Sequence, residues 1–308
     1  MEVCFWGLGS IGQRHLRNLK KVCEEQDLKL SVDAFRSSNT PLSEDIDKLV
    51  DKSIYVEKDL KTEYDIIFVT NPTVCHYETL KNYIVKTRSA YIEKPIFINT
   101  SQKWWDIPWR PEGTYHVASP LRWHPVIQYI KKYQKNLSAI SVRSICSSYL
   151  PDWRKDCDYR KNYSAIKKMG GGVALDLIHE WNYLTYLFGF PQKIGFLKGK
   201  YSSLEIDSDD LAIYIAQYKD MLAEIHLDYF GKIPKRKIEI YSNDGVFEGD
   251  FITNKITPCT GESFILDNTD MYLCEMRDFI KNCLEGTRGD NTPENAWKEL
   301  GLTEGVVL

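Results

Sequence analysis

The chain has 308 residues, a formal net charge of -3, 43% hydrophobic residues and 27% charged residues. This is an ordinary globular composition with room for about two domains. The small net charge argues against a protein held to nucleic acid by bulk charge, and no apolar run is long enough to span a bilayer, so neither partner is expected.

The eight cysteines form no C-x-x-C pair, and several fall among apolar residues. The first strand begins at once, which leaves no room for a signal peptide. We therefore expect reduced thiols in a cytoplasmic protein, and neither a disulfide framework nor a zinc site. The six histidines show no metal-ligand spacing, so no metal is expected.

A strand that leads directly into a glycine-rich turn opens the chain. Residues 2–6 are apolar and β-prone, residues 7–12 read G-L-G-S-I-G, and apolar residues at helical spacing follow. Between a strand and a helix this pattern predicts a phosphate cradle. Gly7 permits the tight turn, Gly9 lets the backbone approach a pyrophosphate, and Gly12 lets the helix pack close to the strand. The alternative is a glycine-rich turn without a ligand.

Strands and helices continue to alternate after this turn. Residues 28–35 alternate as a strand does, and 65–70 are the nearly continuous apolar run of a strand buried on both faces. Residues 80–84 mark the next helix, 90–92 a short strand and 115–118 a further one. This order predicts a doubly wound parallel sheet, an α/β fold that binds ligands at the carboxyl ends of its strands.

The pattern changes near residue 120. The expected elements are helices at 123–133, 173–188, 273–283 and from Thr292-Pro293 onward, strands at 139–149, 211–218, 222–230, 237–241 and 246–248, and a polar, aromatic loop from about 151 to 168. Several strands follow one another without an intervening helix. This half is therefore predicted to be an α+β domain with an open, mainly antiparallel sheet.

Glu93-Lys94-Pro95 ends the short strand at 90–92. At the carboxyl end of a sheet strand, a lysine can hydrogen-bond a substrate oxygen and stabilise negative charge that develops on it. Pro95 fixes φ and limits where the lysine points, and a cis peptide bond before it would sharpen the turn. A surface lysine in a turn is the simpler interpretation of an isolated E-K-P.

Gly170-Gly171-Gly172 precede the predicted helix at 173–188, in which Asp176 and His179 lie three residues apart. Residues at this spacing share a helix face, and Tyr183 lies one turn further along. We expect the pair to project together after a flexible glycine run. A histidine suits proton transfer from a hydroxyl, and a neighbouring carboxylate can orient it. The alternative is an N-terminal aspartate beside a packed histidine.

These three features form an ordered set: the glycine turn, E-K-P after a late strand, and G-G-G-x-x-x-D-x-x-H after the change of fold. In that order and spacing the chain resembles the glucose–fructose oxidoreductase and inositol dehydrogenase family, Gfo/Idh/MocA, over nearly its whole length. The resemblance implies a Rossmann domain over 1–119 and a substrate domain over 120–308, with the last helix packed back on the first domain. It also implies a homodimer or homotetramer formed through the C-terminal sheet, and NAD- or NADP-dependent oxidoreduction of a sugar, cyclitol or nucleotide sugar.

The resemblance carries roles to individual residues. Lys94 matches the E-K-P lysine, and Asp176 and His179 match the acid–base pair, so these three are the expected catalytic groups. Residues 70–76 match a T-N-P-x-x-x-H stretch beside the cofactor. The residues expected at the cofactor are Gly7, Gly9, Ser10, Ile11, Gly12, Arg36, Ser37, Asn71, Pro72, His76, Glu93 and Lys94. Those expected at the substrate are Lys94, Arg122, Trp153, Arg154, Tyr163, Asp176 and His179.

Two positions depart from the family pattern. Pro120 stands where an asparagine is usual near the domain junction, and Asn182 stands where an aspartate is common, three residues after the histidine.

The end of the second strand bears on the choice of cofactor. An NAD enzyme usually presents an acidic side chain there, but Asp33 comes too early because the strand continues through Phe35. Arg36 and Ser37 follow, and a guanidinium pairs well with a 2′-phosphate. NADP is therefore favoured over NAD. The alternative is an arginine that lies over the adenine, which NAD also tolerates.

The segment 149–163 combines three tyrosines with Trp153, Arg154 and Arg160. Flat aromatic faces suit sugar rings, and arginines suit carboxylates or phosphates. We interpret the segment as a substrate loop for a polyhydroxylated ring, with or without an acidic or nucleotide group. A loop that packs on the sheet or on a partner subunit is the alternative.

Together these features predict an oxidoreductase in which Lys94 from the first domain and His179 from the second converge over one nicotinamide ring. Two alternatives stay open. One is an NAD-dependent glycoside hydrolase of the same fold, whose bound cofactor is not consumed. The other is a non-catalytic, dinucleotide-sensing regulator, which the complete Lys–Asp–His set disfavours.

Overall fold

The computed structural model describes residues 1–133, 138–154 and 157–308. The chain folds as two compact units, residues 1–120 with 270–297, and residues 121–269 with 298–308. The chain first passes from the first unit to the second after residue 120, one residue from the predicted boundary. Residues 270–297, which the sequence-based division assigns to the second domain, belong to the first unit. No helix in the described ranges is long and apolar enough to cross a membrane.

The first unit holds a six-stranded parallel sheet. Its strands are β1 (Glu2–Trp6), β2 (Ser31–Phe35), β3 (Lys52–Ile54), β4 (Tyr64–Val69), β5 (Thr87–Ile92) and β6 (Thr114–Val117). They are ordered β3-β2-β1-β4-β5-β6, which is the strand order of a Rossmann fold. The predicted doubly wound parallel sheet is thus confirmed.

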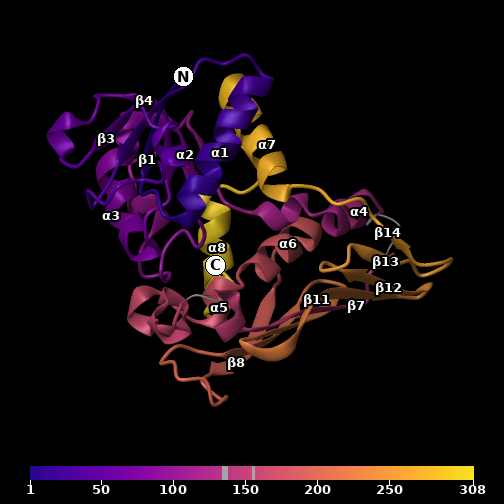
Figure 1. Ribbon diagram of the computed structural model, residues 1–308. Helices are drawn as coiled ribbons and strands as arrows, with labels where there is room; N and C mark the ends of the chain where they lie inside the picture. The colour runs from indigo at the N-terminus through magenta and orange to yellow at the C-terminus, as the bar shows by residue number, and fades with distance from the viewer. Residues whose placement is uncertain (134–137, 155–156) are drawn as a thin grey trace. The chain divides into compact units, whose positions relative to one another are not determined.

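Helices cover both faces of this sheet. Successive residues of a strand point to opposite faces, so neighbouring residues of β1 contact different helices. Phe5 of β1 belongs to the hydrophobic core formed with α1 (Ser10–Glu25) and α7 (Met271–Glu285), and these two helices lie side by side in Figure 1. The next residue, Trp6, instead contacts the ring of Tyr83 in α3 (Thr73–Tyr83), with ring centroids 5.1 Å apart. The short helix α2 (Glu44–Asp47) lies between β2 and β3 in the chain.

The second unit holds an open eight-stranded sheet. Its strands are β7 (Ser141–Tyr149), β8 (Lys193–Gly199), β9 (Leu211–Gln217), β10 (Leu222–Asp228), β11 (Phe230–Ser242), β12 (Gly245–Asp250), β13 (Lys255–Thr257) and β14 (Phe264–Ile265). Their order is β14-β13-β12-β11-β7-β10-β9-β8. The β7–β10 pair is parallel, and the other pairs are antiparallel. The predicted mainly antiparallel sheet is confirmed.

Helices α4 (Pro125–Tyr133) and α6 (His179–Phe188) contact each other and pack against strands of this sheet. In α6, Trp181 contacts the ring of Tyr214 on β9 at 5.3 Å. On the opposite face of β9, Ile213 and Ile215 are 40% and 56% exposed. The last helix, α8 (Pro293–Thr303), begins in the first unit and ends in the second.

The predicted continuous helix at 173–188 is wrong, because it is broken in two. Helix α5 (Val173–Asp176) ends at Asp176, and α6 begins at His179. Leu177 and Ile178 between them are both buried. Leu177 has φ -98° and ψ 24°, outside the α-helical region, so α5 ends there. Tyr183 lies one turn after His179 in α6; it is fully buried, and its hydroxyl lies 2.6 Å from the Ser144 hydroxyl.

Candidate active site

The glycine turn between β1 and α1 is held tightly against the sheet. Gly7 has φ 93°, and a Cβ on it would lie 3.0 Å from the Asn71 Cα atom. Its N–H donates to the Phe35 carbonyl at 3.1 Å, and the Thr70 hydroxyl donates to its carbonyl at 2.6 Å. Both the left-handed conformation and the lack of space require glycine at this position.

The other two glycines of the turn differ in what surrounds them. A Cβ on Gly12 would lie 2.7 Å from the Gly7 carbonyl oxygen, whereas one on Gly9 would meet nothing within 4 Å. Ser10 and Ile11 begin α1, whose first turn carries no acidic residue and whose N-terminus has no side-chain cap. Uncapped N–H groups, the positive end of the helix dipole and the open space at Gly9 fit a pyrophosphate.

Alanine at Gly12 should therefore affect stability, whereas alanine at Gly9 should affect dinucleotide binding. We expect Gly12→Ala to lower the free energy of unfolding by about 1–3 kcal/mol, because the methyl group overlaps backbone. We expect Gly9→Ala to leave stability unchanged, since its φ of -67° suits alanine, and to weaken dinucleotide binding about tenfold or more. Thermal melts and cofactor titrations of both variants measure these effects. Native dinucleotide affinity in Gly9→Ala would contradict the prediction that the pyrophosphate binds at this turn.

The end of β2 presents Arg36 in place of an acidic side chain. Strand β2 ends at Phe35, as predicted, and Asp33 is buried and accepts a hydrogen bond from the Tyr64 hydroxyl at 2.9 Å. The Arg36 guanidinium donates to the Tyr55 hydroxyl at 3.1 Å and to the Thr40 carbonyl. Ser37 beside it is exposed. Asp33 is thus occupied inside the sheet, and the groups that follow β2 are a half-buried guanidinium and an exposed hydroxyl.

His76 holds two turns at the carboxyl edge of the sheet together. Its ring is fully buried. Nε2 lies 2.9 Å from the Asn71 carbonyl, which follows β4, and Nδ1 lies 3.2 Å from the Pro95 carbonyl, which follows β5. Burial lowers the pKa of His76, while the hydrogen bonds to these carbonyls oppose that shift. The ring nitrogens therefore face backbone, and His76 positions its neighbours; Pro72, by contrast, is exposed at the start of α3.

The E-K-P turn is anchored on both sides of Lys94. The Lys94–Pro95 peptide bond is cis. The Glu93 carboxylate lies 2.5 Å from Nε2 of His15 in α1, and both side chains are buried. Burial alone would raise the pKa of Glu93, but the hydrogen bond from His15 and the charges of His15 and Lys94 bring that pKa below its usual value. Lys94 itself is half-buried at the carboxyl end of β5.

In the second unit, the glycine run is packed rather than flexible. A Cβ on Gly171 would overlap the Tyr163 carbonyl, and one on Gly172, at φ 130°, would lie 2.5 Å from the Asp209 carboxylate. Asp209 caps the helix that follows, because its carboxylate accepts the Ala174 N–H at 3.0 Å. The run therefore fixes where α5 begins.

Asp176 lies between two tyrosines. It is buried and accepts a hydrogen bond of 2.5 Å from the Tyr229 hydroxyl, and it is also hydrogen-bonded to Tyr163. Burial and the negative charge of Asp176 raise the pKa of both tyrosines, so they stay protonated and donate. His179 is half-buried three residues later, and a single face is not enforced because the helix breaks between the two residues.

Arg122 takes part in a buried polar network. It is 6% exposed, and its guanidinium donates to Asn182 at 3.0 Å and to Glu299 at 3.1 Å. The amide of Asn182 also donates to the other Glu299 oxygen at 2.8 Å. An aspartate at 182 would put a second carboxylate against Glu299, which accounts for the amide here. Substrate binding by Arg122 stays a prediction, since these contacts occupy two of its nitrogens.

The predicted substrate loop presents two differently engaged arginines, with residues 155–156 lying outside the described residues. The Trp153 ring packs edge-on against Tyr229, with centroids 5.3 Å apart. Arg160 is paired with Asp158 at 2.8 Å and Glu205 at 3.1 Å. Arg154 instead donates to the Asn162 side-chain oxygen at 3.3 Å. In the described part of the chain, no ion pair involves Arg154.

Two contacts of this site were not predicted from the sequence. His15 lies on the apolar stripe of α1 between Gly12 and Leu16, and a polar residue on a buried helix face indicates a buried partner. That signal could have found His15 but not its partner Glu93. No local pattern points to Tyr229, whose contact with Asp176 spans 53 residues.

The first sheet has the strand order of a Rossmann fold, and the second unit holds an open, mainly antiparallel sheet. No family model matches the sequence, and no curated protein matches it significantly. Among solved structures, a levoglucosan dehydrogenase in complex with NADH and levoglucosan matches with a TM-score of 0.85 and 13% identity, covering 100% of this chain and 96% of that chain.

Two further structures match along their length. A myo-inositol 2-dehydrogenase from Lactobacillus plantarum has a TM-score of 0.78 and 17% identity over 99% of this chain and 95% of that chain. A UDP-N-acetylglucosamine 3-dehydrogenase from Acidithiobacillus ferrooxidans has a TM-score of 0.77 and 17% identity over 100% and 96%. The fold expected from the resemblance to the Gfo/Idh/MocA family is confirmed.

Proposed function

We propose that the chain is an NAD(P)-dependent oxidoreductase that acts on a hydroxyl or keto carbon of a sugar, cyclitol or nucleotide sugar. The observation that carries the proposal is the complete set of Lys94, Asp176 and His179 in a chain that shares its fold with dehydrogenases of all three substrate classes. A lone E-K-P or a lone D-x-x-H would carry little.

The nucleotide site supports a nicotinamide dinucleotide. The open space at Gly9, the uncapped start of α1 and the guanidinium of Arg36 fit a pyrophosphate and an adenosine ribose. Of the two cofactors, NADP is favoured because a guanidinium and a hydroxyl, rather than a carboxylate, follow β2. When bound, the nicotinamide supplies the hydride chemistry.

The residues of the chain supply position and proton handling. Lys94 donates a hydrogen bond to the reacting substrate oxygen and stabilises negative charge on it. His179 holds or releases the proton of that hydroxyl. Asp176, itself fixed by the Tyr229 hydroxyl, orients the imidazole or binds a neighbouring substrate hydroxyl.

The chemistry of Arg154 favours a substrate with an acidic group. Arg160 is neutralised by two carboxylates, whereas Arg154 contacts an amide oxygen. Its charge lies close enough to Tyr163 to lower the pKa of that tyrosine against the larger raising effect of burial. A guanidinium near Tyr163 that forms no ion pair within the described residues suits a carboxylate or phosphate on the sugar.

The two arginines therefore form a matched pair for a test. With an acidic sugar as substrate, we expect Arg154→Ala to raise KM about 10-fold to 100-fold, because a charge-assisted hydrogen bond is lost. We expect Arg160→Ala to change KM less than about threefold, since its charge is already balanced. Steady-state kinetics of both variants measure the two KM values. Equal changes in KM would contradict the inference that Arg154, and not Arg160, binds the acidic group.

We infer that the chain assembles through its second sheet. The outward face of β8, β9 and β10 exposes Leu197, Ile213, Ile215 and Leu222, at 77%, 40%, 56% and 51%. Contiguous apolar surface of this kind marks an interface, and a second copy covers it symmetrically. Light scattering should return a dimer or tetramer that Ile215→Glu dissociates; a monomeric native chain would contradict the inference.

We also infer a cytoplasmic location. All eight cysteines are free thiols, as in proteins of a reducing compartment. Fractionation of the tagged chain with an extracellular or periplasmic fraction would contradict this.

Two measurements test the proposed function. The chain is titrated with NADPH and NADH separately, with tighter binding of NADPH expected; if neither binds, the proposal fails. Sugars, cyclitols and nucleotide sugars are then screened for a change of absorbance at the nicotinamide band. Glycosidic cleavage without net consumption of cofactor would identify the hydrolase alternative, and tight binding without any turnover would identify the regulator.

A further inference from the structure

The crossover from β5 to β6 contains no α-helix in this structure. Residues 93–113 are described throughout, and they form a single 3₁₀ turn at Trp104–Asp106. Crossovers between parallel strands usually carry a helix that covers the sheet. Three tryptophans, Trp104, Trp105 and Trp109, occupy this segment instead.

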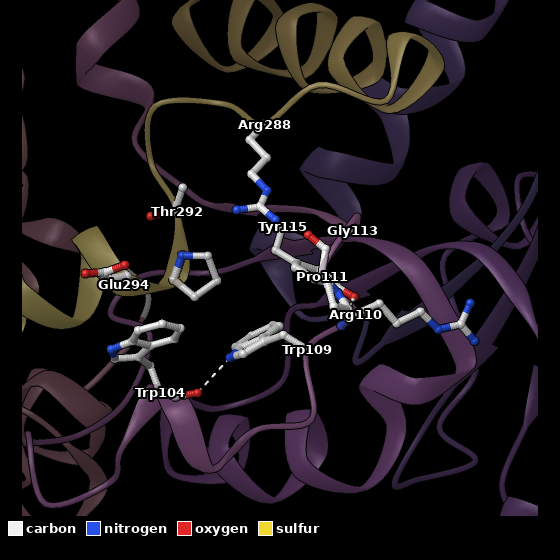
Figure 2. A pocket seen from close by; sticks show the side chains of 10 residues that line it. Trp104, Trp109, Arg110, Pro111, Gly113, Tyr115, Arg288, Thr292 and Glu294 are labelled. Atoms are coloured by element: carbon white, nitrogen blue, oxygen red, sulfur yellow. Dashed lines mark hydrogen bonds between the residues drawn. The ribbon is translucent and has the colours of Figure 1, made fainter.

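A pocket of about 240 Å³ lies where this segment meets the loop after α7 and the start of α8. Its walls include Trp104, Trp109 and Tyr115, together with Arg288 and Glu294. Figure 2 shows Arg288 reaching from the loop after α7 toward Tyr115, on the side of the pocket opposite the two tryptophans. All of these residues belong to the first unit, so the pocket is complete within one compact body.

One wall of this pocket lies at the edge of the sheet opposite the nucleotide site. Tyr115 is the second residue of β6, and it pairs with Ala90, the fourth of the six residues of β5. Arg110 in the pocket wall is paired with Glu63, which directly precedes β4. The glycine turn and Lys94 instead follow β1 and β5. Six-residue strands separate the two edges by about 15–20 Å at about 3.3 Å per residue.

The aromatic walls are held in place by hydrogen bonds. The Trp109 indole N–H donates to the Trp104 carbonyl at 2.7 Å, and the Tyr115 hydroxyl accepts the Arg110 N–H at 3.0 Å. The Trp109 and Tyr115 rings contact each other, with centroids 4.8 Å apart. A Cβ on Gly113 would overlap the Tyr115 ring. A ligand therefore meets preformed ring faces, which reduces the entropy lost on binding.

The two arginines at the pocket are engaged differently. Arg110 is committed to Glu63 at 2.7 Å and to the Val85 carbonyl at 2.6 Å. Arg288 is exposed and donates to the Pro111 carbonyl. No ion pair involves Arg288 anywhere in residues 1–133, 138–154 and 157–308. Its fork of donors is therefore available to an anion.

We propose that this pocket is a second ligand site, which takes a single hydroxylated ring that carries one carboxylate or phosphate. The C–H face of such a ring stacks on the tryptophans, Arg288 pairs with the anionic group, and Glu294 accepts hydrogen bonds from ring hydroxyls. The volume suits one ring and excludes a dinucleotide, because pockets for larger ligands usually exceed about 300 Å³. The site is independent of the proposed function, since it shares no residue with the nucleotide or acid–base sites.

Indole NMR of the full chain tests direct contact. The eight tryptophans are labelled with ¹⁵N, and the signals of the pocket are assigned with Trp104→Phe and Trp109→Phe. Glucuronate, glucose 6-phosphate and glucose are titrated separately to about 10 mM, a range that detects weak, millimolar binding. We expect both pocket signals to shift with at least one acidic sugar, and the carboxylate and phosphate arms show which anion is preferred. No shift with either acidic sugar would overturn the proposal.

Matched variants assign the shift to the pocket. Arg288→Ala should weaken binding of the acidic sugar about 10-fold to 100-fold, while Arg88→Ala, which removes an exposed charge on β5 outside the pocket, should not. Lys94→Ala should bind with native affinity, which separates this site from the catalytic one. Native affinity in Arg288→Ala, equal binding of glucose, or loss of binding in Lys94→Ala would each overturn the proposal.

Discussion

Lys94→Ala is expected to reduce kcat about 100-fold to 1000-fold or more. A single preorganised donor to a developing oxyanion contributes on this scale. The turn that carries Lys94 is fixed by His15 through Glu93 and by His76 through the Pro95 and Ile96 carbonyls. Because these anchors do not involve the lysine side chain, the truncated variant keeps its fold.

The controls use the same strand. Lys86 directly precedes β5 and donates to the Lys61 carbonyl at 3.1 Å, whereas Lys94 follows β5 at the opposite edge. Lys86→Ala should therefore retain native kcat. Lys94→Arg keeps the charge but changes its shape, so partial activity is expected. Stopped-flow and steady-state kinetics with the substrate found in the screen measure all three, and full turnover by Lys94→Ala would remove this residue from the mechanism.

Much of the fold was predictable because its signals are local. The buried apolar strand at 65–70 and the glycine turn at 7–12 carry distinctive patterns, and both led to the parallel sheet. Strand β3 was not predicted, because three residues at the edge of a sheet carry no periodicity. Strand β8 was not predicted either, since its burial does not alternate and most of its side chains are exposed.

The contacts of the candidate site were less predictable, because they join distant parts of the chain. His15 and Glu93 are 78 residues apart, and Arg122 and Glu299 are 177 residues apart. The sequence identified Lys94, Asp176 and His179 as a set, but the partners that fix them come from elements whose packing is decided by the tertiary structure. Residues 270–297 illustrate the same limit: an amphipathic pattern predicts helix α7 without indicating which unit it covers.

The sequence-based interpretation of the glycine run at 170–172 was also wrong. Three consecutive glycines indicated flexibility, whereas Gly171 and Gly172 are required by close approach to the Tyr163 carbonyl and the Asp209 carboxylate. Glycine serves both purposes, and only the neighbours in space separate them.

His179→Asn is expected to reduce kcat about 100-fold to 10,000-fold, the range of general acid–base catalysis. Asparagine keeps a hydrogen-bonding group of similar reach but cannot hold the proton. Tyr229→Phe is the matched test of positioning, since it removes the 2.5 Å hydrogen bond to Asp176 and leaves the imidazole in place. We expect a smaller loss of kcat for Tyr229→Phe, because the carboxylate remains and only its orientation is relaxed.

A double variant tests whether Lys94 of the first unit and His179 of the second unit act in the same reaction. If Lys94 and His179 act on the same substrate oxygen, the loss of kcat in Lys94→Ala/His179→Asn should be clearly smaller than the product of the two single losses, because groups that act as a unit are non-additive. Losses that simply multiply would mean independent roles. Native turnover in His179→Asn, with Lys94→Ala inactive, would assign the proton transfer to another group and leave Asp176 as the first candidate.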